Sequence, residues 1–459
     1  MLLALALVVW AVFWLSEDVR KEAQLRAGLL MGDVATEVVR RQGASERAAD
    51  FIDVPLAVRE VGDGIYQATG VANVQVIVTS EGRVVFDTGL ATQAARQKQL
   101  LDEVTGDVPV THVILSHSHQ DHVGGTRFWT REGVEIVAHR EFPEEQRYLR
   151  ELQDYFWFRN RTLFPWMPER PPRIGLLAYG GIEPTRFVDE GAPYVFEQGG
   201  VEFVVLSTPG AEGADNISLW LPQTRTLLSG DTFGPIFPQF PNIFTMRGEK
   251  IRKPIEYIHS LEKLIALGPE RVVPSHRDPV EGGDEIRAGL ERIRDAVRYV
   301  HDEVVAGMNA GRSVEELMAS VQLPPELALT QAHGRVSWAV KSIWEYYGTW
   351  FHFDTTTELY PVPRSAVYGD LAELAGAQAL VEKAREHLAA SEPVHALHLL
   401  DIVIGADPSS RPAQRVRREA LERLLAEAES GLRNSYEMDW LRYRIRLADE
   451  ALAQGPDGP

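Results

Sequence analysis

The sequence predicts an α/β domain of layered sheets and helices, followed by an all-helical domain. Short β-branched runs broken by turn residues occupy 58–89, which is typical of strands joined by tight connections. Strand-like and helix-like segments then alternate as far as residue 276, and beyond residue 283 nearly every segment has helical periodicity. We therefore divide the chain into an N-terminal anchor segment and linker helix at 1–50, the α/β domain at 51–362 and the helical domain at 363–459.

The individual elements follow from local patterns. Residues 94–104 have the apolar spacing of a helix, and residues 371–452 repeat that spacing, with ADP at 406–408 separating two helices. The segments predicted to be strands are GIYQATG at 64–70, NVQVIVTSEG at 73–82, RVVFDTG at 83–89, VTHVILSH at 110–117, EIVAHREF at 135–142 and RVVPSH at 271–276. The layered domain is thus expected to precede the helices in the chain.

Charge and cysteine content exclude several classes of function. The formal net charge of −19 argues against a nucleic-acid partner, because neutralising phosphates requires a basic surface. A small anionic substrate is still compatible with this charge if cations stand at its binding site. The chain contains no cysteine, so disulfides, thiolate metal sites and cysteine nucleophiles are excluded. Any metal must be held by histidines and carboxylates.

The first 15 residues form an apolar run that is followed abruptly by charged residues. As a helix this run would cover ~22 Å of a hydrocarbon core ~30 Å thick, and it has neither a basic start nor an obvious cleavage site. It is interpreted as a signal anchor or an uncleaved signal peptide, with a buried helix as the alternative. We expect a periplasmic protein, or one tethered to the membrane through residues 1–15 and facing outside the cytoplasm.

A cluster of histidines and an aspartate follows the strand predicted to end at Ser116. In an extended segment alternate side chains point the same way, so the first two histidines can share one cation, and the remaining pair can bind a second. Nitrogen and oxygen ligands without sulfur suit zinc, with manganese or iron as alternatives, and Gly124–Gly125 permits a tight turn. The four residues in ILSHSHQDHVGG are His117, His119, Asp121 and His122.

These residues carry a resemblance to a known family. THVILSHSHQDHVGG resembles the signature of the metallo-β-lactamase fold, a four-layered αββα hydrolase scaffold, and NVQVIVTSEGRVVFDTG is similar to its opening strands. Most members have a histidine where this chain has Ala211, in STPGAEGADN. Zinc-dependent alkyl sulfatases, the type III sulfatases, instead use a glutamate one residue later, where this chain has Glu212. Residues 366 to about 453 resemble the helical dimerisation domain of that subfamily, whereas its C-terminal sterol-carrier-like domain is absent.

The resemblance implies a site for two zinc ions per protomer. Asp231 would stand at the bridging position, where the sulfatases usually have glutamate, although an aspartate after a glycine can also be a cap. His276 could alternatively be a core histidine. Asp215 is the alternative to Glu212 as the metal ligand that follows the TPG sequence at 208–210. Asp87 is expected to orient ligands rather than to bind metal. The predicted metal ligands are His117, His119, Asp121, His122, Glu212, Asp231 and His276, and Asp121 is also assigned a catalytic role.

The substrate is expected to be a small anionic or amphiphilic ester. By resemblance, Arg247 in FTMRG is the sulfate clamp, although an arginine there could also be a plain surface residue. The stretch YFWFRNRTLFPWMP at 155–168 interleaves aromatic residues with Arg159 and Arg161, which suits a wall for an apolar chain with an anionic head. The alternative is an amphipathic lid that packs on the core.

We therefore expect a homodimeric binuclear zinc hydrolase that uses a metal-bridging hydroxide on alkyl sulfate esters. A second hypothesis keeps the scaffold and the metals but assigns them to another ester, a lactone, a phosphate ester or a β-lactam. A third is a non-catalytic dimeric assembly protein, against which a full set of metal ligands argues.

Overall fold

The computed structural model describes residues 16–41, 55–106, 108–164, 167, 169–170, 181–210, 212–243 and 245–454. As far as the chain is described, it forms two compact units, Met1–Arg161 with Pro165–Ile343, and Thr162–Phe164 with Trp344–Pro459. The division at 343/344 precedes the predicted boundary at 362/363. Within the second unit the rings of Trp344 and His352 meet edge to face at 5.1 Å.

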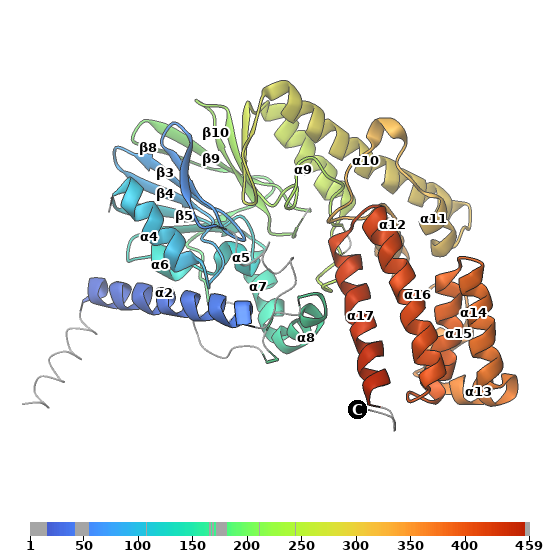
Figure 1. Cartoon of the computed structure of the whole chain (residues 1–459). Coiled ribbons are helices and arrows are strands. Elements are labelled where there is room, and N and C mark those ends of the chain that lie inside the picture. The colour runs from blue at the N-terminus through green and yellow to red at the C-terminus, as the bar shows by residue number, and fades with distance from the viewer. Residues whose placement is uncertain are drawn as a thin grey trace, which may run out of the picture. The chain divides into compact units, whose positions relative to one another are not determined.

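The first unit contains a seven-stranded sheet in the order β1-β2-β3-β4-β5-β6-β7 (Figure 1). Neighbours from β1 to β4 are antiparallel and those from β4 to β7 are parallel, as expected for hairpins followed by strand–helix units. The strands are β1 Val58–Gly62, β2 Ile65–Ala68, β3 Val74–Thr79, β4 Gly82–Phe86, β5 Val110–Ile114, β6 Glu135–His139 and β7 Arg186–Val188.

A second sheet of six strands has the order β13-β12-β11-β10-β9-β8. Only β11 and β12 are parallel neighbours in this sheet as described, and its other pairs are antiparallel. The strands are β8 Tyr194–Gln198, β9 Val201–Ser207, β10 Ile217–Leu221, β11 Thr226–Gly230, β12 Arg271–Pro274 and β13 Val280–Glu281.

The two sheets pack face to face through a common apolar core. Phe86 and Ile114 of the first sheet lie in one buried cluster with Phe203, Ile217 and Leu228 of the second. Fully burying each such side chain contributes about 1.5–3 kcal/mol relative to leaving it exposed. The layer between the sheets therefore holds the strand ends in fixed positions.

Helices cover the outer faces, which completes the predicted αββα arrangement. Leu101 of α4 (Ala94–Thr105) and Trp129 of α6 (Thr126–Trp129) are buried in a second core cluster with residues of the first sheet. On the other side, α10 (Gly283–Asn309) contacts β12 and β13 and packs along α9 (Pro254–Leu267). The remaining helices of this unit are α2 Glu17–Arg41, α5 Gln120–Val123, α7 Phe142–Glu151, α8 Gln153–Leu163, α11 Val314–Ser320, η1 Pro325–Leu327 and α12 Val336–Gly348, of which α8 and α12 run into the second unit.

The second unit is helical, as predicted. Val381, Leu400 and Val416 lie in one buried cluster, while Leu421 and Leu441 lie in another. The predicted break at 406–408 is confirmed, because one helix ends at Ala406 and the next begins at Arg411. The elements are η2 Thr356–Leu359, η3 Arg364–Val367, α13 Tyr368–Ala375, α14 Ala377–Ala389, α15 Pro393–Ala406, α16 Arg411–Ser430 and α17 Ser435–Ala453.

The predicted anchor at residues 1–15 lies outside the described residues. Among the helices that the structure does describe, none combines the length and the apolar character needed to cross a membrane.

Candidate metal centre

The predicted ligands stand at the carboxyl ends of strands in both sheets. Asp87 directly follows β4, and the histidine-rich turn follows its parallel neighbour β5. In the second sheet Asp231 follows β11, and His276 lies two residues after the parallel strand β12. Because the carboxyl ends of parallel strands share one edge of a sheet, each pair of parallel strands brings its side chains together. The backbone N–H of Ile217 donates to the carbonyl of Ser116 at 2.8 Å and ties the two edges to each other.

The turn after β5 depends on its two glycines. A Cβ atom added at Gly125 would lie 2.2 Å from the carbonyl oxygen of Thr88, and one at Gly124 would lie 2.3 Å from the backbone nitrogen of Ala91. The turn therefore packs with its backbone against the backbone of residues 88–91. This contact fixes the place from which the short helix α5 starts.

The first ligand set lies at one end of the centre. The Nε2 atom of His117 is 2.8 Å from the Nδ1 atom of His119, and this Nδ1 is 3.9 Å from an Oε2 atom of Glu212. His117 is completely buried and Glu212 is 4% exposed. Three potential ligand atoms thus face one another, as the spacing of the motif predicts for one cation.

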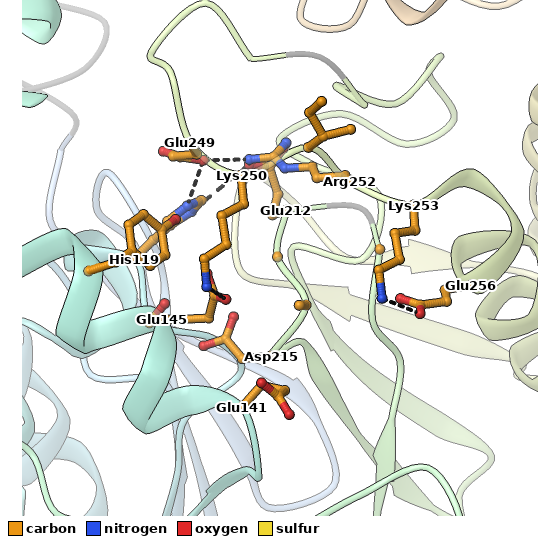
Figure 2. A pocket seen from close by; sticks show the side chains of 16 residues that line it. His119, Glu141, Glu145, Glu212, Asp215, Glu249, Lys250, Arg252, Lys253 and Glu256 are labelled. Atoms are coloured by element: carbon orange, nitrogen blue, oxygen red, sulfur yellow. Dashed lines mark hydrogen bonds and ion pairs between the residues drawn. The ribbon is translucent and has the colours of Figure 1, made fainter. Parts of the chain in front are cut away.

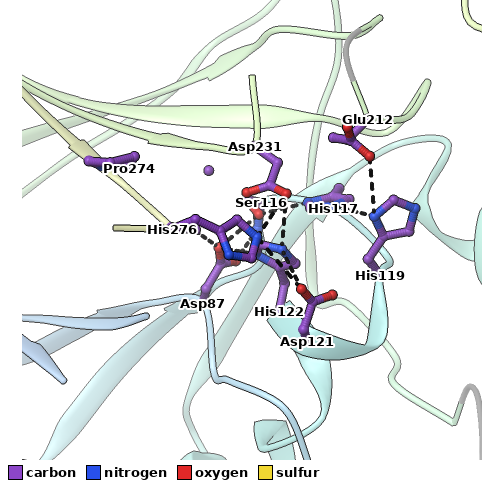
Figure 3. A network of polar contacts seen from close by, with 12 residues as sticks. Asp87, Ser116, His117, His119, Asp121, His122, Glu212, Asp231, Pro274 and His276 are labelled. Atoms are coloured by element: carbon purple, nitrogen blue, oxygen red, sulfur yellow. Dashed lines mark hydrogen bonds and ion pairs between the residues drawn. The ribbon is translucent and has the colours of Figure 1, made fainter. Parts of the chain in front are cut away.

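The second ligand set adjoins the first. Asp231 Oδ2 lies 3.4 Å from His122 Nε2 and 3.1 Å from His276 Nε2, and Asp121 Oδ2 lies 3.6 Å from each of the same two nitrogens (Figure 3). The ligand atoms of His117, His122 and Asp231 also lie within 4.8 Å of one another. Asp231 is therefore within reach of His117 of the first set as well as of His122 and His276 of the second.

The donor set fits a pair of divalent transition metals. The His122 Nε2 and Asp231 Oδ1 atoms are buried and, among the described residues, have no hydrogen-bond partner. Burying such atoms without partners costs free energy, and a cation would compensate for it. Imidazole nitrogens and carboxylate oxygens without sulfur are the ligands that suit zinc, manganese or iron.

Asp87 orients the second ligand set, as its place in the sequence suggests. This buried aspartate accepts hydrogen bonds from the backbone N–H of Ser116 at 2.8 Å and from the hydroxyls of Ser116 and Ser275 at 2.8 and 2.6 Å. Its Oδ2 also lies 2.8 Å from His122 Nδ1, which leaves His122 Nε2 facing the centre. Asp87 adopts a left-handed backbone with φ of 57°, a conformation that is uncommon for a residue other than glycine.

Without a cation the buried charges perturb one another strongly. Burial lowers the pKa of His117 far below its usual value, and the charges of His122 and His119 lower it further. Burial also opposes a charge on His122, but Asp231, Asp121 and Asp87 together raise its pKa well above the usual value. The pKa of Asp231 is well below its usual value, because the two neighbouring histidines outweigh the effect of burial. The centre therefore concentrates anionic oxygens around imidazole nitrogens.

Glu212 and Asp215 occupy different positions. Glu212 approaches His119, and its pKa falls to about 2, because Arg252, His333 and Arg247 outweigh the effect of burial. Asp215 is 1% exposed, and burial raises its pKa to about 7, to which the charge of Glu145 adds. Asp215 faces a cavity of about 220 Å³ beside the centre (Figure 2). The structure thus brings Glu212, and not its competitor, to the first ligand set.

The predicted clamp lies at the centre, but the two arginines of the aromatic stretch lie elsewhere. Arg247 Nη2 is 3.5 Å from Glu212 Oε2. Arg159 donates to the backbone carbonyls of Met246 and Arg247 at 3.0 Å each, so its guanidinium supports the segment that carries Arg247. Arg161 is half-buried, and its Nε has no hydrogen-bond partner among the described residues.

The aromatic stretch has both exposed and buried members. Tyr155 and Phe158 are 51% and 58% exposed, whereas Phe156 is buried. Residues 165, 166 and 168 lie outside the described part of the chain. The cavity beside the centre is lined mainly by charged and polar side chains and not by this stretch.

Three residues that the sequence did not single out complete the centre. Arg252 Nη2 lies 3.0 Å from Glu212 Oε2, and His333 Nε2 lies 3.5 Å from the other oxygen of Glu212. Glu249 contacts His119, Arg247 and Arg252. The only local signal was the charged run RGEKIR at 247–252, which a surface loop would also show.

Comparisons with known proteins give matches to two families and to several sulfatases. Residues 68–276 match the metallo-beta-lactamase superfamily, and residues 313–444 match the alkyl sulfatase dimerisation family. A linear primary-alkylsulfatase of a Pseudomonas species is 30% identical over 316 residues, covering 63% of this chain and 58% of the relative. The alkyl/aryl-sulfatase of Saccharomyces cerevisiae is 25% identical over 408 residues, covering 82% of this chain and 62% of the relative.

A solved structure shows the same fold over most of the chain. The stereoselective inverting sec-alkylsulfatase of a Pseudomonas species superposes with a TM-score of 0.74 at 23% identity, covering 86% of this chain and 66% of the other. The chain spans 58% to 62% of the length of the four alkylsulfatase relatives that it matches.

Proposed function

Since the chain joins a domain of the metallo-β-lactamase superfamily to an alkyl sulfatase dimerisation domain, we propose that it is a binuclear zinc hydrolase of alkyl sulfate esters. The observation that carries the proposal is the convergence of two groups of ligand atoms that share His122, with the guanidinium of Arg247 3.5 Å from Glu212. His117, His119 and Glu212 would hold one ion. Asp121, His122 and His276 would hold the other.

When bound, the two ions would supply Lewis acidity and an activated water near neutral pH. The residues of the chain would hold the ions and orient the substrate and the ligands. Arg247 presents a planar guanidinium that can hold two oxygens of a tetrahedral anion and direct the ester bond toward the ions. Asp87 keeps His122 in the tautomer that exposes its Nε2.

The composition of the cavity favours a second candidate substrate class. Its lining includes the charged residues Glu145, Asp215, Glu249 and Lys250, which are able to contact a polar ester. A phosphate or carboxylic ester with a polar leaving group, or a lactone or β-lactam, is therefore the alternative on the same scaffold.

A substrate panel on the metal-loaded protein tests the proposal. We expect release of inorganic sulfate from medium-chain alkyl sulfates, faster than hydrolysis of matched phosphate and carboxylic esters, and two metal ions per chain by elemental analysis. Faster hydrolysis of another ester would assign the same centre to the second class. A purified protein that binds one metal ion or none, and cleaves no ester, would instead favour the assembly protein.

We also propose that the protein is a homodimer held by its helical unit. Support comes from the match to the dimerisation family and from large apolar side chains exposed in this unit, such as Phe353 and Leu374, both 86% exposed. Light scattering is expected to give about twice the chain mass of 51.3 kDa. Phe353→Glu combined with Leu374→Glu should shift the protein toward the monomer, whereas Lys383→Glu on α14 should not. A double variant that remains fully dimeric would place the interface elsewhere.

The proposed location is outside the cytoplasm, supported by the apolar composition of residues 1–15. Cell fractionation is expected to recover the protein from the membrane or the periplasm. Recovery from the cytosol with Met1 intact would contradict this proposal.

A further inference from the structure

A carboxylate stands between the first ligand set and the anion clamp. Glu249 Oε2 lies 3.3 Å from His119 Nε2 and 2.8 Å from Arg252 Nη2 (Figure 2). Its Oε1 lies 3.1 Å from Arg247 Nη2. The Glu249 side chain is only 11% exposed. Its carboxylate thus touches a metal ligand and the clamp at the same time.

The contact with His119 resembles the contact between Asp87 and His122. The Nδ1 atom of His119 faces His117 and Glu212, so the Nε2 atom on the opposite edge of the ring is available to Glu249. A carboxylate that accepts a hydrogen bond from a ligand imidazole fixes the ring and raises its basicity, and losing it typically costs 10- to 100-fold in metal affinity. Glu249 should therefore strengthen metal binding at the first set.

The contact between Glu249 and Arg247 is expected to weaken the binding of anions, whereas the contact with His119 strengthens the binding of metal. Both arginines pair with Glu212 and Glu249, and Arg252 also donates to the carbonyl of Asn242 at 2.6 Å. Arg247 has the more exposed side chain of the two, at 20% against 3%. An anion that approaches Arg247 meets the negative charge of Glu249 directly beside the guanidinium. This repulsion grows with the charge of the incoming anion.

We propose that Glu249 is a positioning and specificity-determining residue that selects singly charged ester heads over doubly charged anions while it holds His119 for the metal. The inference rests on the proposed function and narrows its substrate class. An alkyl sulfate ester carries one negative charge, whereas inorganic sulfate and a fully ionised phosphate monoester carry two. Glu249 thus weakens binding of the singly charged ester less than binding of dianionic phosphate monoesters, and it speeds the departure of the sulfate product.

Glu249→Gln separates these effects because it removes the charge and keeps an oxygen beside His119. Calorimetry on the metal-loaded protein would compare inorganic sulfate with methanesulfonate, a singly charged anion that cannot be hydrolysed. We expect sulfate to bind about tenfold more tightly to the variant and methanesulfonate about threefold more tightly, because the repulsion scales with charge. Zinc affinity, measured by competition with a chelator, is expected to fall about tenfold.

Two further variants make the result decisive. Glu249→Ala also lacks the acceptor, so its zinc affinity should fall further, with the same gain in anion binding. Glu256→Gln removes an equal charge from the lining of the same cavity, where the carboxylate pairs with Lys253 at 2.7 Å, and is expected to change each affinity by less than about twofold. A merely damaged site would lose affinity for metal and anion together, whereas the proposal requires opposite changes.

Equal gains for the two anions, an unchanged zinc affinity, or the same shifts in Glu256→Gln would overturn the proposal. Failure of both the parent protein and the Glu249 variants to bind sulfate would overturn it too. None of these measurements needs turnover. A protein that binds metal and anions as expected but cleaves no ester would therefore refute the proposed function and leave the assignment of Glu249 intact.

Discussion

His122→Ala is expected to reduce ester hydrolysis on the order of 10⁴-fold, equivalent to about 5.5 kcal/mol of transition-state stabilisation. His122 Nε2 belongs to both groups of converging ligand atoms, together with His117 and Asp231 in one and with Asp121 and His276 in the other. Its removal takes away a neutral nitrogen ligand. The neighbouring carboxylates then repel one another more strongly. The metal content should fall below two ions per chain.

Rates on an alkyl sulfate and elemental analysis of the same samples measure this effect. His387→Ala in the helical unit is the matched control, since it deletes a histidine that pairs with Glu392 at 2.6 Å and is expected to keep both the rate and the metals. Thermal unfolding would show whether Asp87, now without its imidazole partner, also lowers stability. Retention of two ions and of the parent rate in His122→Ala would refute the assigned centre.

Arg247→Lys is expected to slow anionic esters by roughly 30- to 1,000-fold, which is about 2 to 4 kcal/mol, with the fold and both metals kept. A guanidinium can hold two oxygens of a tetrahedral anion at once, whereas an ammonium acts as a single point charge. The side chain is well placed for this role, because Arg159 supports its backbone carbonyl while its Nη2 reaches Glu212 and Glu249.

Neutral esters should lose much less than anionic ones in this variant, so kcat/KM for a matched pair of substrates is the informative measurement. Arg186→Lys, on the exposed strand β7, serves as the control for the substitution itself. Equal losses for neutral and anionic esters, or no loss, would place the clamp elsewhere and weaken the assignment to sulfate esters.

Local sequence patterns were sufficient for most of the fold. Apolar residues at a spacing of two predict the strands, and apolar residues at a spacing of 3.6 predict the helices. These spacings arise because strands and helices bury one or two faces in a layered domain. The helix predicted at 94–104 and the start of the helical region near Gly283 agree with α4 and α10. The predicted boundary at 362/363 and the division at 343/344 differ by residues 344–362, which have no clear apolar period.

The candidate centre was predictable only where its residues stand close together in sequence or at strand ends. His117, His119, Asp121 and His122 share one turn, and Asp231 and His276 each follow a buried strand. Arg252, His333 and Glu249 come from segments without periodicity, and only the folded chain brings them to Glu212 and His119. The sequence context of Arg159 suggested a substrate contact but not the two backbone carbonyls that its guanidinium binds.

The backbone-to-backbone packing of the turn at Gly124–Gly125 against residues 88–91 has a consequence for how such a chain can diverge after gene duplication. A side chain at either glycine would meet main-chain atoms, which no change of a neighbouring rotamer can move aside. Arg247 and Glu249, in contrast, lie between β11 and α9 on a segment whose described residues form no helix or strand. Inheritance is therefore strict for the turn that carries the proposed metal ligands and permissive for the segment that carries the proposed clamp, so duplicated copies can change that segment while they retain the turn.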